Sequence, residues 1–175
     1  MALIPIGQAP APQFDDPLGV LRACHRRMER QLATLSRLRR HLPANHADEE
    51  ARVAAAATMR YFDLAAPDHH EDEEASLMPR LAKADPALTP LMKELVREHA
   101  QLEAQWMRMR PLLTAIAARA SGHLPVKGVE AFCDAYRAHI AREETVLFAR
   151  AAEILDGASL AEIGAEMAER RELRG

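Results

Sequence analysis

The sequence contains few aromatic residues, only two cysteines and no long apolar run. Aromatic residues make up 4% of its 175 residues, whereas alanine, leucine and methionine dominate a hydrophobic fraction of 49%. Unbranched side chains lose little rotamer freedom in a helix, so this composition favours helix over sheet. No apolar stretch approaches the roughly 20 residues that a transmembrane helix needs, so we expect no membrane span or membrane partner.

The two cysteines, Cys24 and Cys133, lie far apart and form no Cys-x-x-Cys motif. The amino-terminal stretch carries no basic segment before its apolar residues and is interrupted by prolines, unlike a secretory signal. We therefore expect a cytoplasmic protein without a disulfide. The net charge of −3, with both signs mixed, does not indicate a nucleic-acid-binding protein.

Helix signals divide the chain into three parts. We expect an irregular amino-terminal arm over residues 1–15, four long helices over residues 16–156, and a short carboxyl-terminal helix over residues 157–175 that packs on the others. The second of the four long helices continues or kinks across Pro67. Four long helices with short connections predict an all-α fold, an antiparallel four-helix bundle of up-down-up-down order.

Capping residues predict where several of these helices begin and end. Asp16-Pro17 is a capping residue followed by proline in the first turn, which is typical of a helix start. Gly157 is expected to end the fourth long helix as a left-handed cap. Ser159 and Glu162 have the spacing of a capping box, which would open the final helix.

Histidine is the residue type whose placement carries chemistry. The second and fourth helices repeat the pattern His-x-x-x-Glu-Glu-x-x-Leu, beginning at His69 and His139. The first and third helices each carry a His-x-x-x-Glu, beginning at His25 and His99. Residues four apart lie on one face of a helix. Each helix can therefore direct an imidazole and a carboxylate to the same point in the interior.

This pattern predicts a metal site. Several ionisable side chains that face one core cost several kcal/mol each unless they are paired or coordinated. Any one of the histidines could be structural, but their occurrence on all four helices favours coordination. Four histidines with two or three glutamates exceed the tetrahedral shell of one zinc ion. Imidazole with bridging carboxylate suits two iron ions, with room for an oxo or hydroxo bridge between them.

These motifs resemble the hemerythrin-like family, also called the HHE cation-binding domain, over roughly residues 16–156. The residues that carry the resemblance are His25, His69, His70, Glu73, Glu74, Leu77, Met78, Pro79, Glu98, His99, His139, Glu143, Glu144, Leu147 and Phe148. The resemblance implies a non-haem di-iron centre in which two glutamates bridge the irons and each iron takes two histidines. The implied bridges are Glu73 and Glu143, and the implied histidine pairs are His25 with His69 and His99 with His139.

The sequence differs from the oxygen-carrying members of that family. Those members have His-x-x-x-His on the third helix, where this chain has His99 followed by Glu103, and they bridge with one Glu and one Asp. Glu103 is therefore a candidate metal ligand, with an exposed helix-face acid as the alternative. An added carboxylate would stabilise Fe(III) over Fe(II), which argues against reversible oxygen carriage.

Three further residues are candidates for an extra ligand or for a hydrogen-bond partner of a ligand: His70, Tyr136 and Glu29. Each has a simpler alternative. His70 is surrounded by acidic residues and could be solvated, Tyr136 could fill the core, and Glu29 could pair with nearby arginines.

The expected function is the binding or sensing of oxygen, peroxide, nitric oxide or iron, so the expected partner is a small diatomic ligand or peroxide. An enzyme that turns over peroxide or nitric oxide at the same centre is the alternative, and we assign no catalytic residue. A protein-interaction module that uses the arginine-rich first helix is less favoured, because a solvated face explains those charges. The sequence does not define the oligomeric state.

Overall fold

The computed structural model describes residues 13–174, and every regular element in that range is a helix. Residues 1–12 of the predicted arm lie outside the described range, and residues 13–15 are not helical. The elements are α1 (Pro17–Asn45), α2 (Glu49–Arg60), η1 (Tyr61–Ala65), α3 (Ala66–Asp72), η2 (Glu73–Leu77), α4 (Met78–Ala84), η3 (Pro86–Leu88), α5 (Thr89–Ala117), α6 (Val126–Arg142), η4 (Glu143–Leu147), α7 (Phe148–Ile154) and α8 (Gly157–Arg174). The prediction of an all-α fold is confirmed.

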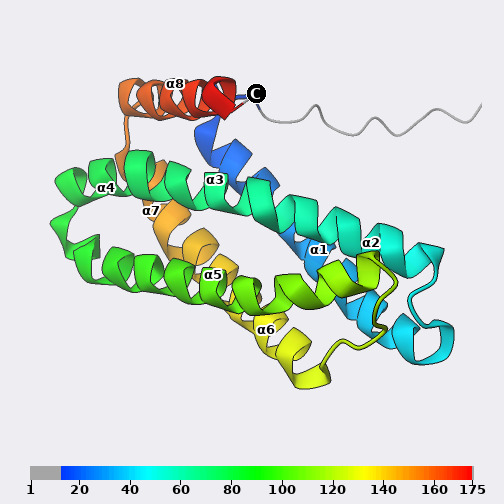
Figure 1. The fold of residues 1–175 in the computed structure, drawn as a ribbon. Helices are drawn as coiled ribbons and strands as arrows, with labels where there is room; N and C mark the ends of the chain where they lie inside the picture. The colour runs from blue at the N-terminus through cyan, green and yellow to red at the C-terminus, as the bar shows by residue number, and fades with distance from the viewer. Residues whose placement is uncertain (1–12, 175) are drawn as a thin grey trace, which may run out of the picture.

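The elements combine into four long helical segments and one carboxyl-terminal helix (Figure 1). The second segment runs from α2 through α4, and the fourth comprises α6, η4 and α7. Helix α1 packs against α2 and α6, and α5 packs against the same two helices, so the four segments enclose a common interior. Helix α8 lies against α1, α3 and η2 at one end (Figure 1). Helix α8 has 18 residues.

Aspartate side chains cap the first two helices. The carboxylate of Asp16 accepts a hydrogen bond from the backbone N–H of Gly19 at 2.9 Å, at the predicted start of α1. The carboxylate of Asp48 accepts one from the N–H of Ala51 at 2.9 Å and starts α2. Because a cap depends only on neighbouring residues, these starts could be predicted from the sequence.

The start of α8 differs from the prediction. The carboxylate of Asp156 accepts a hydrogen bond from the backbone N–H of Ser159 at 2.8 Å, so Asp156 is the cap. Gly157 is already the first residue of α8 and does not have a positive φ. The predicted left-handed cap at Gly157 and the capping box at Ser159 and Glu162 were therefore wrong. Aspartate is among the strongest amino-terminal caps, and here it precedes both of the residues that we had chosen.

Three elements, η1, η2 and η4, are single π-turns, in which the hydrogen-bonded ring is one residue wider than in an α-helix. Pro67 and Pro79 follow η1 and η2 closely. Proline lacks an N–H and clashes with the carbonyl group four residues before it in a regular helix. We attribute the continuation of the second segment across both prolines to these wider turns.

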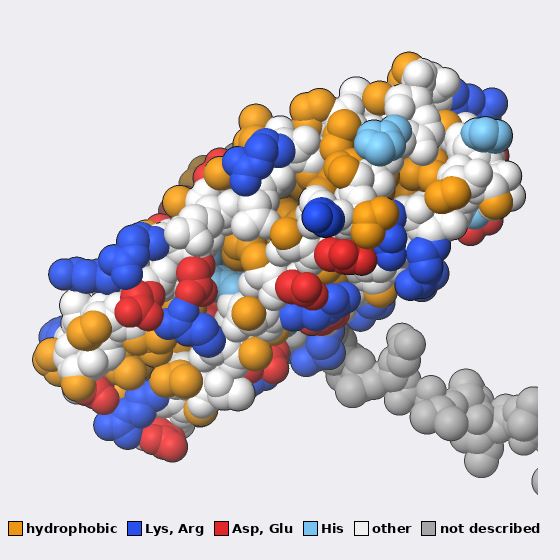
Figure 2. All heavy atoms as spheres, turned by 90° about the horizontal axis from the view of Figure 1, so that it is seen from below, with side chains coloured by type: hydrophobic (Ala, Val, Ile, Leu, Met, Phe, Trp, Pro, Cys, Tyr) orange, Lys and Arg blue, Asp and Glu red, His pale blue; other side chains and the backbone are white. Residues whose placement is uncertain are grey.

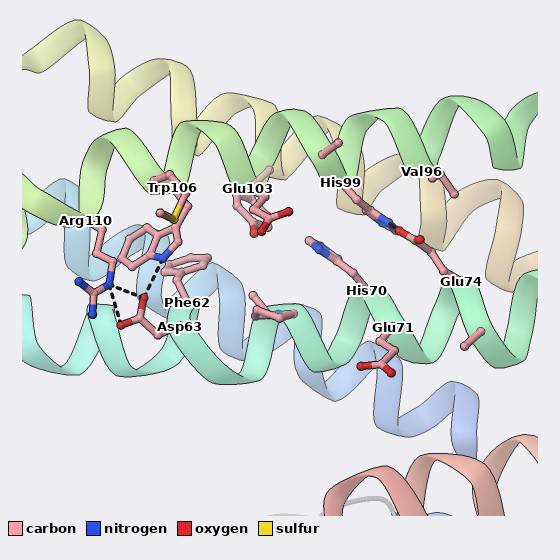
Figure 3. A pocket seen from close by; sticks show the side chains of 16 residues that line it. Phe62, Asp63, His70, Glu71, Glu74, Val96, His99, Glu103, Trp106 and Arg110 are labelled. Atoms are coloured by element: carbon pink, nitrogen blue, oxygen red, sulfur yellow. Dashed lines mark hydrogen bonds and ion pairs between the residues drawn. The ribbon is translucent and has the colours of Figure 1, made fainter. Parts of the chain in front are cut away.

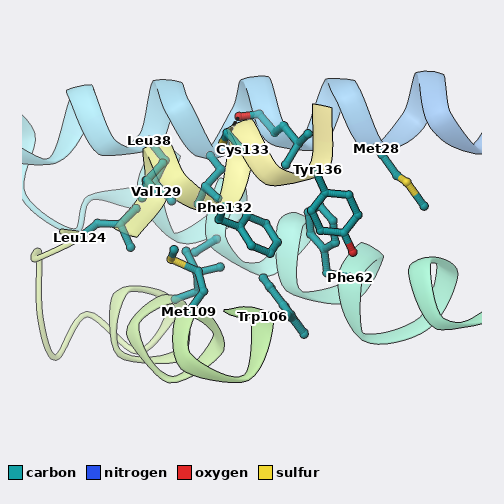
Figure 4. Close-up of a cluster of buried hydrophobic side chains, with 14 of the residues drawn as sticks. Met28, Leu38, Phe62, Trp106, Met109, Leu124, Val129, Phe132, Cys133 and Tyr136 are labelled. Carbon is teal, nitrogen blue, oxygen red and sulfur yellow. Dashed lines mark hydrogen bonds between the residues drawn. The ribbon is translucent and has the colours of Figure 1, made fainter. Parts of the chain in front are cut away.

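Two apolar clusters fill the interior. The first core cluster includes Phe62, whose ring centroid lies 5.1 Å from that of Trp106 and 5.3 Å from those of Phe132 and Tyr136 (Figure 4). The second core cluster comprises Leu18, Val20, Leu21, Leu77, Met78, Leu81, Met92, Leu95, Leu147, Phe148, Ala151, Ile163 and Met167. Along each long segment, the histidine singled out in the sequence falls between residues of the two clusters. A polar layer thus separates two apolar cores.

No helix in the described range has both the length and the apolar character needed to cross a membrane. On the face shown in Figure 2, acidic and basic side chains alternate and no broad patch of one sign forms. Cys24 and Cys133 are both buried free thiols.

Candidate metal centre

Six side chains from the four long segments converge in the polar layer. They form two groups of four residues, and within each group the potential ligand atoms lie within 4.8 Å of one another. One group comprises His25, His69, Glu73 and Glu143, and the other comprises Glu73, His99, His139 and Glu143. Each of these side chains is at most 4% exposed. Glu73 and Glu143 belong to both groups.

In the first group the closest atoms are imidazole Nε2 atoms and carboxylate oxygens. The Nε2 atom of His25 lies 3.0 Å from Nε2 of His69 and 3.1 Å from Oε2 of Glu143. The Nε2 atom of His69 lies 3.3 Å from Oε1 of Glu73.

The second group has the same arrangement. The Nε2 atom of His99 lies 3.3 Å from a carboxylate oxygen of Glu73 and 3.3 Å from one of Glu143. The Nε2 atom of His139 lies 2.8 Å from Oε1 of Glu143. Each of the two glutamates therefore contacts histidines of both groups.

These atoms suit a metal ion better than they suit one another. Both oxygens of Glu73, Oε2 of Glu143 and Nε2 of His139 are buried without a hydrogen-bond partner in the described part of the chain. Orphaned buried polar atoms are costly unless something coordinates them. Ligands at right angles on a metal with bonds of about 2.1 Å lie roughly 3.0 Å apart, which is close to the distances observed here. The donor set therefore fits cation coordination.

Three of the four histidines have a carboxylate on the ring nitrogen that faces away from the group. The Nδ1 atom lies 3.0 Å from Glu144 in His25, 2.6 Å from Glu74 in His99 and 2.8 Å from Glu98 in His139. Carboxylates only accept hydrogen bonds, so each Nδ1 donates and Nε2 is the nitrogen that can bind a metal ion once it is deprotonated. Such outer carboxylates orient metal-binding histidines and raise their basicity.

These three glutamates lie within the sequence motifs given above, but we predicted no role for them from the sequence. Their role could have been predicted from their positions: Glu74 and Glu144 are the second residues of the two Glu-Glu pairs, and Glu98 directly precedes His99.

His69 has a different neighbourhood. Its Nδ1 atom has no hydrogen-bond partner among residues 13–174. The thiol of Cys24 lies close by and accepts a hydrogen bond from Arg27 at 3.0 Å. Burial raises the pKa of Cys24, but His69 and Arg27 outweigh that effect and the pKa is lowered. The two histidines of the first group are therefore supported by different chemistry.

The ionisable side chains of the two ligand groups stabilise charge on one another. Burial acts to raise the pKa of Glu143, but the close imidazoles of His139, His25 and His99 hold it well below its usual value. Burial acts to lower the pKa of His99, but Glu143 and Glu73 raise it to about 10. The pKa of His69 is also raised, because Glu73 outweighs burial. A cation that binds here would displace protons from these imidazoles.

Comparison with known proteins agrees with this geometry. Residues 16–151 match the family model described as the hemerythrin HHE cation-binding domain. The chain belongs to the hemerythrin HHE cation-binding domain family. It is 30% identical over 161 residues to a protein of Haemophilus influenzae (strain ATCC 51907 / DSM 11121 / KW20 / Rd), and the match covers 92% of this chain and 93% of that protein. That relative is described as an uncharacterized protein.

His70 lies beside the ligand groups of this HHE domain. Its ring stacks on that of His99, with centroids 4.0 Å apart and an interplanar angle of 11°, and its Nε2 is buried without a partner in the described range. One ring nitrogen of His70 nevertheless lies within 4.8 Å of ligand nitrogens of His99 and His139, and these three form a third group that could hold a metal ion. Burial, together with His99 and His69, holds the pKa of His70 well below its usual value, and the ring is neutral.

Tyr136 is buried and packs against Phe62 and Phe132 in the first core cluster. It also lines a cavity of about 750 Å³ that reaches His70 and His99. Burial raises the pKa of Tyr136, so its hydroxyl stays protonated and can donate a hydrogen bond. Tyr136 thus packs in the first core cluster and also lies close to the ligand groups.

The structure does not bring Glu103 and Glu29 into either ligand group. Glu103 is exposed on α5 and lines the same cavity, because Leu102 and Trp106 occupy the interior face of that helix (Figure 3). Glu29 is 44% exposed and pairs with Arg137 at 3.4 Å. Glu103 is thus in the position of an exposed helix-face acid and Glu29 in that of an ion-pair partner of arginine, which were the alternatives given for these two residues.

The cavity lies between the second segment and α5 (Figure 3). Asp63 lies at the end away from His70, where it accepts hydrogen bonds from Trp106 and Arg110 at 2.9 Å (Figure 3). The other end reaches His70 and His99. A small molecule in this cavity would therefore lie next to the second ligand group.

Proposed function

We propose that this HHE domain holds two iron ions, joined by an oxo or hydroxo bridge, and binds or senses a small ligand such as oxygen, peroxide or nitric oxide. One observation carries the proposal. The two buried ligand groups share Glu73 and Glu143, and a carboxylate that contacts two metal sites is the natural bridge between them. His25 and His69 would hold one iron, and His99 and His139 the other.

Iron would supply a reversible change of oxidation state and affinity for small oxygen- or nitrogen-containing ligands. The protein supplies the surroundings. Glu144, Glu74 and Glu98 fix the orientation of three histidines, and the two apolar core clusters limit the access of water. Tyr136 and His70 lie where they can donate a hydrogen bond to a molecule in the cavity.

A second candidate function is an enzyme that turns over peroxide or nitric oxide at the same centre. The cavity favours it, because a volume of about 750 Å³ that reaches His99 is far larger than a diatomic ligand requires. Substrate and product could then exchange without an opening of the helices.

Metal analysis of the purified protein tests the proposal. Two irons per chain are expected, with near-ultraviolet charge-transfer absorption that dithionite bleaches. One zinc per chain and no iron would contradict it. Anomalous scattering at the iron edge from a crystal would identify the metal, the number of ions and the ligands together.

Reaction with air separates the candidate functions. A stable adduct that forms again after anaerobic reduction and exposure to air would support a binding role. Rapid oxidation with consumption of added peroxide would support an enzyme.

We also propose an up-down-up-down order of the four segments and a cytoplasmic location. The packing of α1 and α5 against the same two segments, with short connections between consecutive segments, supports an up-down-up-down order. The buried free thiols Cys24 and Cys133 agree with a reducing compartment and hence with a cytoplasmic location.

A further inference from the structure

Helix α8 brings two arginines to a buried carboxylate beside the metal groups. Asp72 is fully buried and directly precedes Glu73. The Nε atom of Arg170 donates to Oδ1 of Asp72 at 2.9 Å, and the guanidinium of Arg171 contacts both oxygens of the same carboxylate. A buried carboxylate is costly unless it is paired and hydrogen-bonded, and here α8 provides both conditions.

Helix α8 also contacts the π-turn η2 at Ser76. The Nη2 atom of Arg170 donates to the hydroxyl of Ser76 at 2.6 Å. Arg80 donates to the carbonyl group of Ser76 at 3.0 Å and pairs with Glu166 of α8 at 2.8 Å and Glu162 at 3.1 Å. The turn that begins with Glu73 is therefore held at the residue before it and at a residue within it.

The position of α8 is fixed by close packing. Ile163 and Met167 are fully buried in the second core cluster. A Cβ atom on Gly164 would overlap the backbone carbonyl group of Phe14, so glycine allows α8 to approach the segment before α1. Figure 1 shows α8 lying across this end of the molecule.

The π-turn η4 provides an internal comparison. Arg142 takes the position of Asp72 there, and it pairs with Glu94 and Glu98 of α5. Val146 takes the position of Ser76 and is 43% exposed. In both η2 and η4, a charged residue thus precedes the π-turn and is held by another helix. For η4 that helix lies within the matched family region, whereas for η2 it is α8, which follows residues 16–151.

We propose that α8 is a positioning element for the metal centre, in which Arg170 and Arg171 hold η2 so that Glu73 keeps its place between the two ligand groups. Both arginines are positioning residues because they act through Asp72. The effect on metal retention rests on the function proposed above, whereas the effect on η2 does not.

Hydrogen exchange in the metal-free protein tests the effect on η2. In the R170Q/R171Q variant, amides of Glu73–Leu77 should exchange about tenfold faster or more, which corresponds to the loss of a charged hydrogen bond, while amides of Glu143–Leu147 keep their rate. The matched control is E162Q, which removes one exposed ion pair of α8 but leaves Asp72, Ser76 and Glu166 with their partners, and η2 should stay close to its original rate. Equal acceleration of both turns, or none, would overturn the proposal.

A triple variant, D72N/R170Q/R171Q, separates positioning from simple charge compensation. It removes the buried charge together with its partners, so it should fold even if the double variant does not. Exchange in η2 should remain fast because the contacts to α8 are lost. Exchange restored to the original rate would show that the arginines only neutralise Asp72, and would overturn the positioning role.

Release of iron to a chelator measures the consequence for the centre. The R170Q/R171Q variant should release iron about tenfold faster or more, and the E162Q control should behave like the original protein. Equal release rates for the original protein and R170Q/R171Q would overturn the link to the metal. Failure of the original protein to bind iron would instead contradict the proposed function, and the exchange experiment would still decide whether α8 holds η2.

Discussion

The Nδ1 atom of His99, on α5, lies 2.6 Å from the carboxylate of Glu74, on η2. Glu74 directly follows Glu73, whose own carboxylate lies between the two ligand groups. Successive residues of a helix point about 100° apart, so one Glu-Glu pair can serve the metal groups with its first side chain and orient a histidine of the next helix with its second. Glu143 and Glu144 repeat this division with His25.

The shared glutamates should be indispensable for a pair of metals. Replacement of Glu73 or Glu143 by Gln is expected to lose at least one of two irons, because each carboxylate contacts histidines of both groups. Metal content after gel filtration measures this. Retention of both irons in either variant would exclude the bridging role.

The outer carboxylates should tune affinity without providing ligands. Glu98→Gln is expected to weaken metal binding by about 10–100-fold, because His139 loses the acceptor for its Nδ1 proton. Glu94→Gln is the matched control, since Glu94 also pairs with Arg142 but, unlike Glu98, is not hydrogen-bonded to His139. Competition with a chelator gives both affinities, and equal losses would assign the effect to Arg142.

Phe148 should couple the core to the metal centre. Its ring is fully buried and stacks on His25, with centroids 5.2 Å apart. Phe148→Leu and Phe132→Leu should each lower the free energy of unfolding of the metal-free protein by roughly 1–3 kcal/mol, as measured by urea denaturation. Only Phe148→Leu should also weaken metal binding, because Phe132 lies in the first core cluster, away from the ligand histidines. Equal metal affinities would contradict this coupling.

Glu103 should be dispensable for metal binding. Its side chain is exposed and outside both ligand groups, so Glu103→Gln should retain both irons. Loss of an iron in this variant would restore Glu103 as a ligand. Glu29→Gln is the control, because it changes a glutamate at the equivalent place on α1 that pairs with Arg137.

Metal binding should stabilise the fold measurably. A ligand at about 100 times its dissociation constant adds roughly 2.7 kcal/mol to the free energy of unfolding. Thermal unfolding with and without iron should therefore show a clear rise in Tm for the original protein and a smaller one for Glu73→Gln. An unchanged Tm of the original protein at saturating iron would contradict coordination in the core.

The helices and the main histidine motifs could be predicted because their signals are local. Asp16 caps the helix that it precedes, and a four-residue spacing places His69 and Glu73 on one face wherever the helix lies. The same spacing after His99 made Glu103 a candidate ligand, but His99, Leu102 and Trp106 define the interior stripe of α5 and Glu103 lies exposed beside it.

Other features depend on contacts between helices and had no local signal. Whether His70 ligates or stacks depends on where α5 places His99. The pairing of Asp72 with α8 joins residues about 100 positions apart. Such relationships are set by packing, which a single sequence does not display.

The π-turn η2 makes the metal centre sensitive to the number of residues between Glu73 and Leu77, and not only to which residues they are. Ala75 is exposed within that turn and contributes no ligand, so most substitutions there should be harmless. Its removal would shorten the widened turn by one residue, and Glu73 and Leu77 would lose their present relation along the helix. A deletion at Ala75 should thus damage the metal centre more than a substitution at almost any surface position. A residue with no chemical role of its own can still be essential as a spacer.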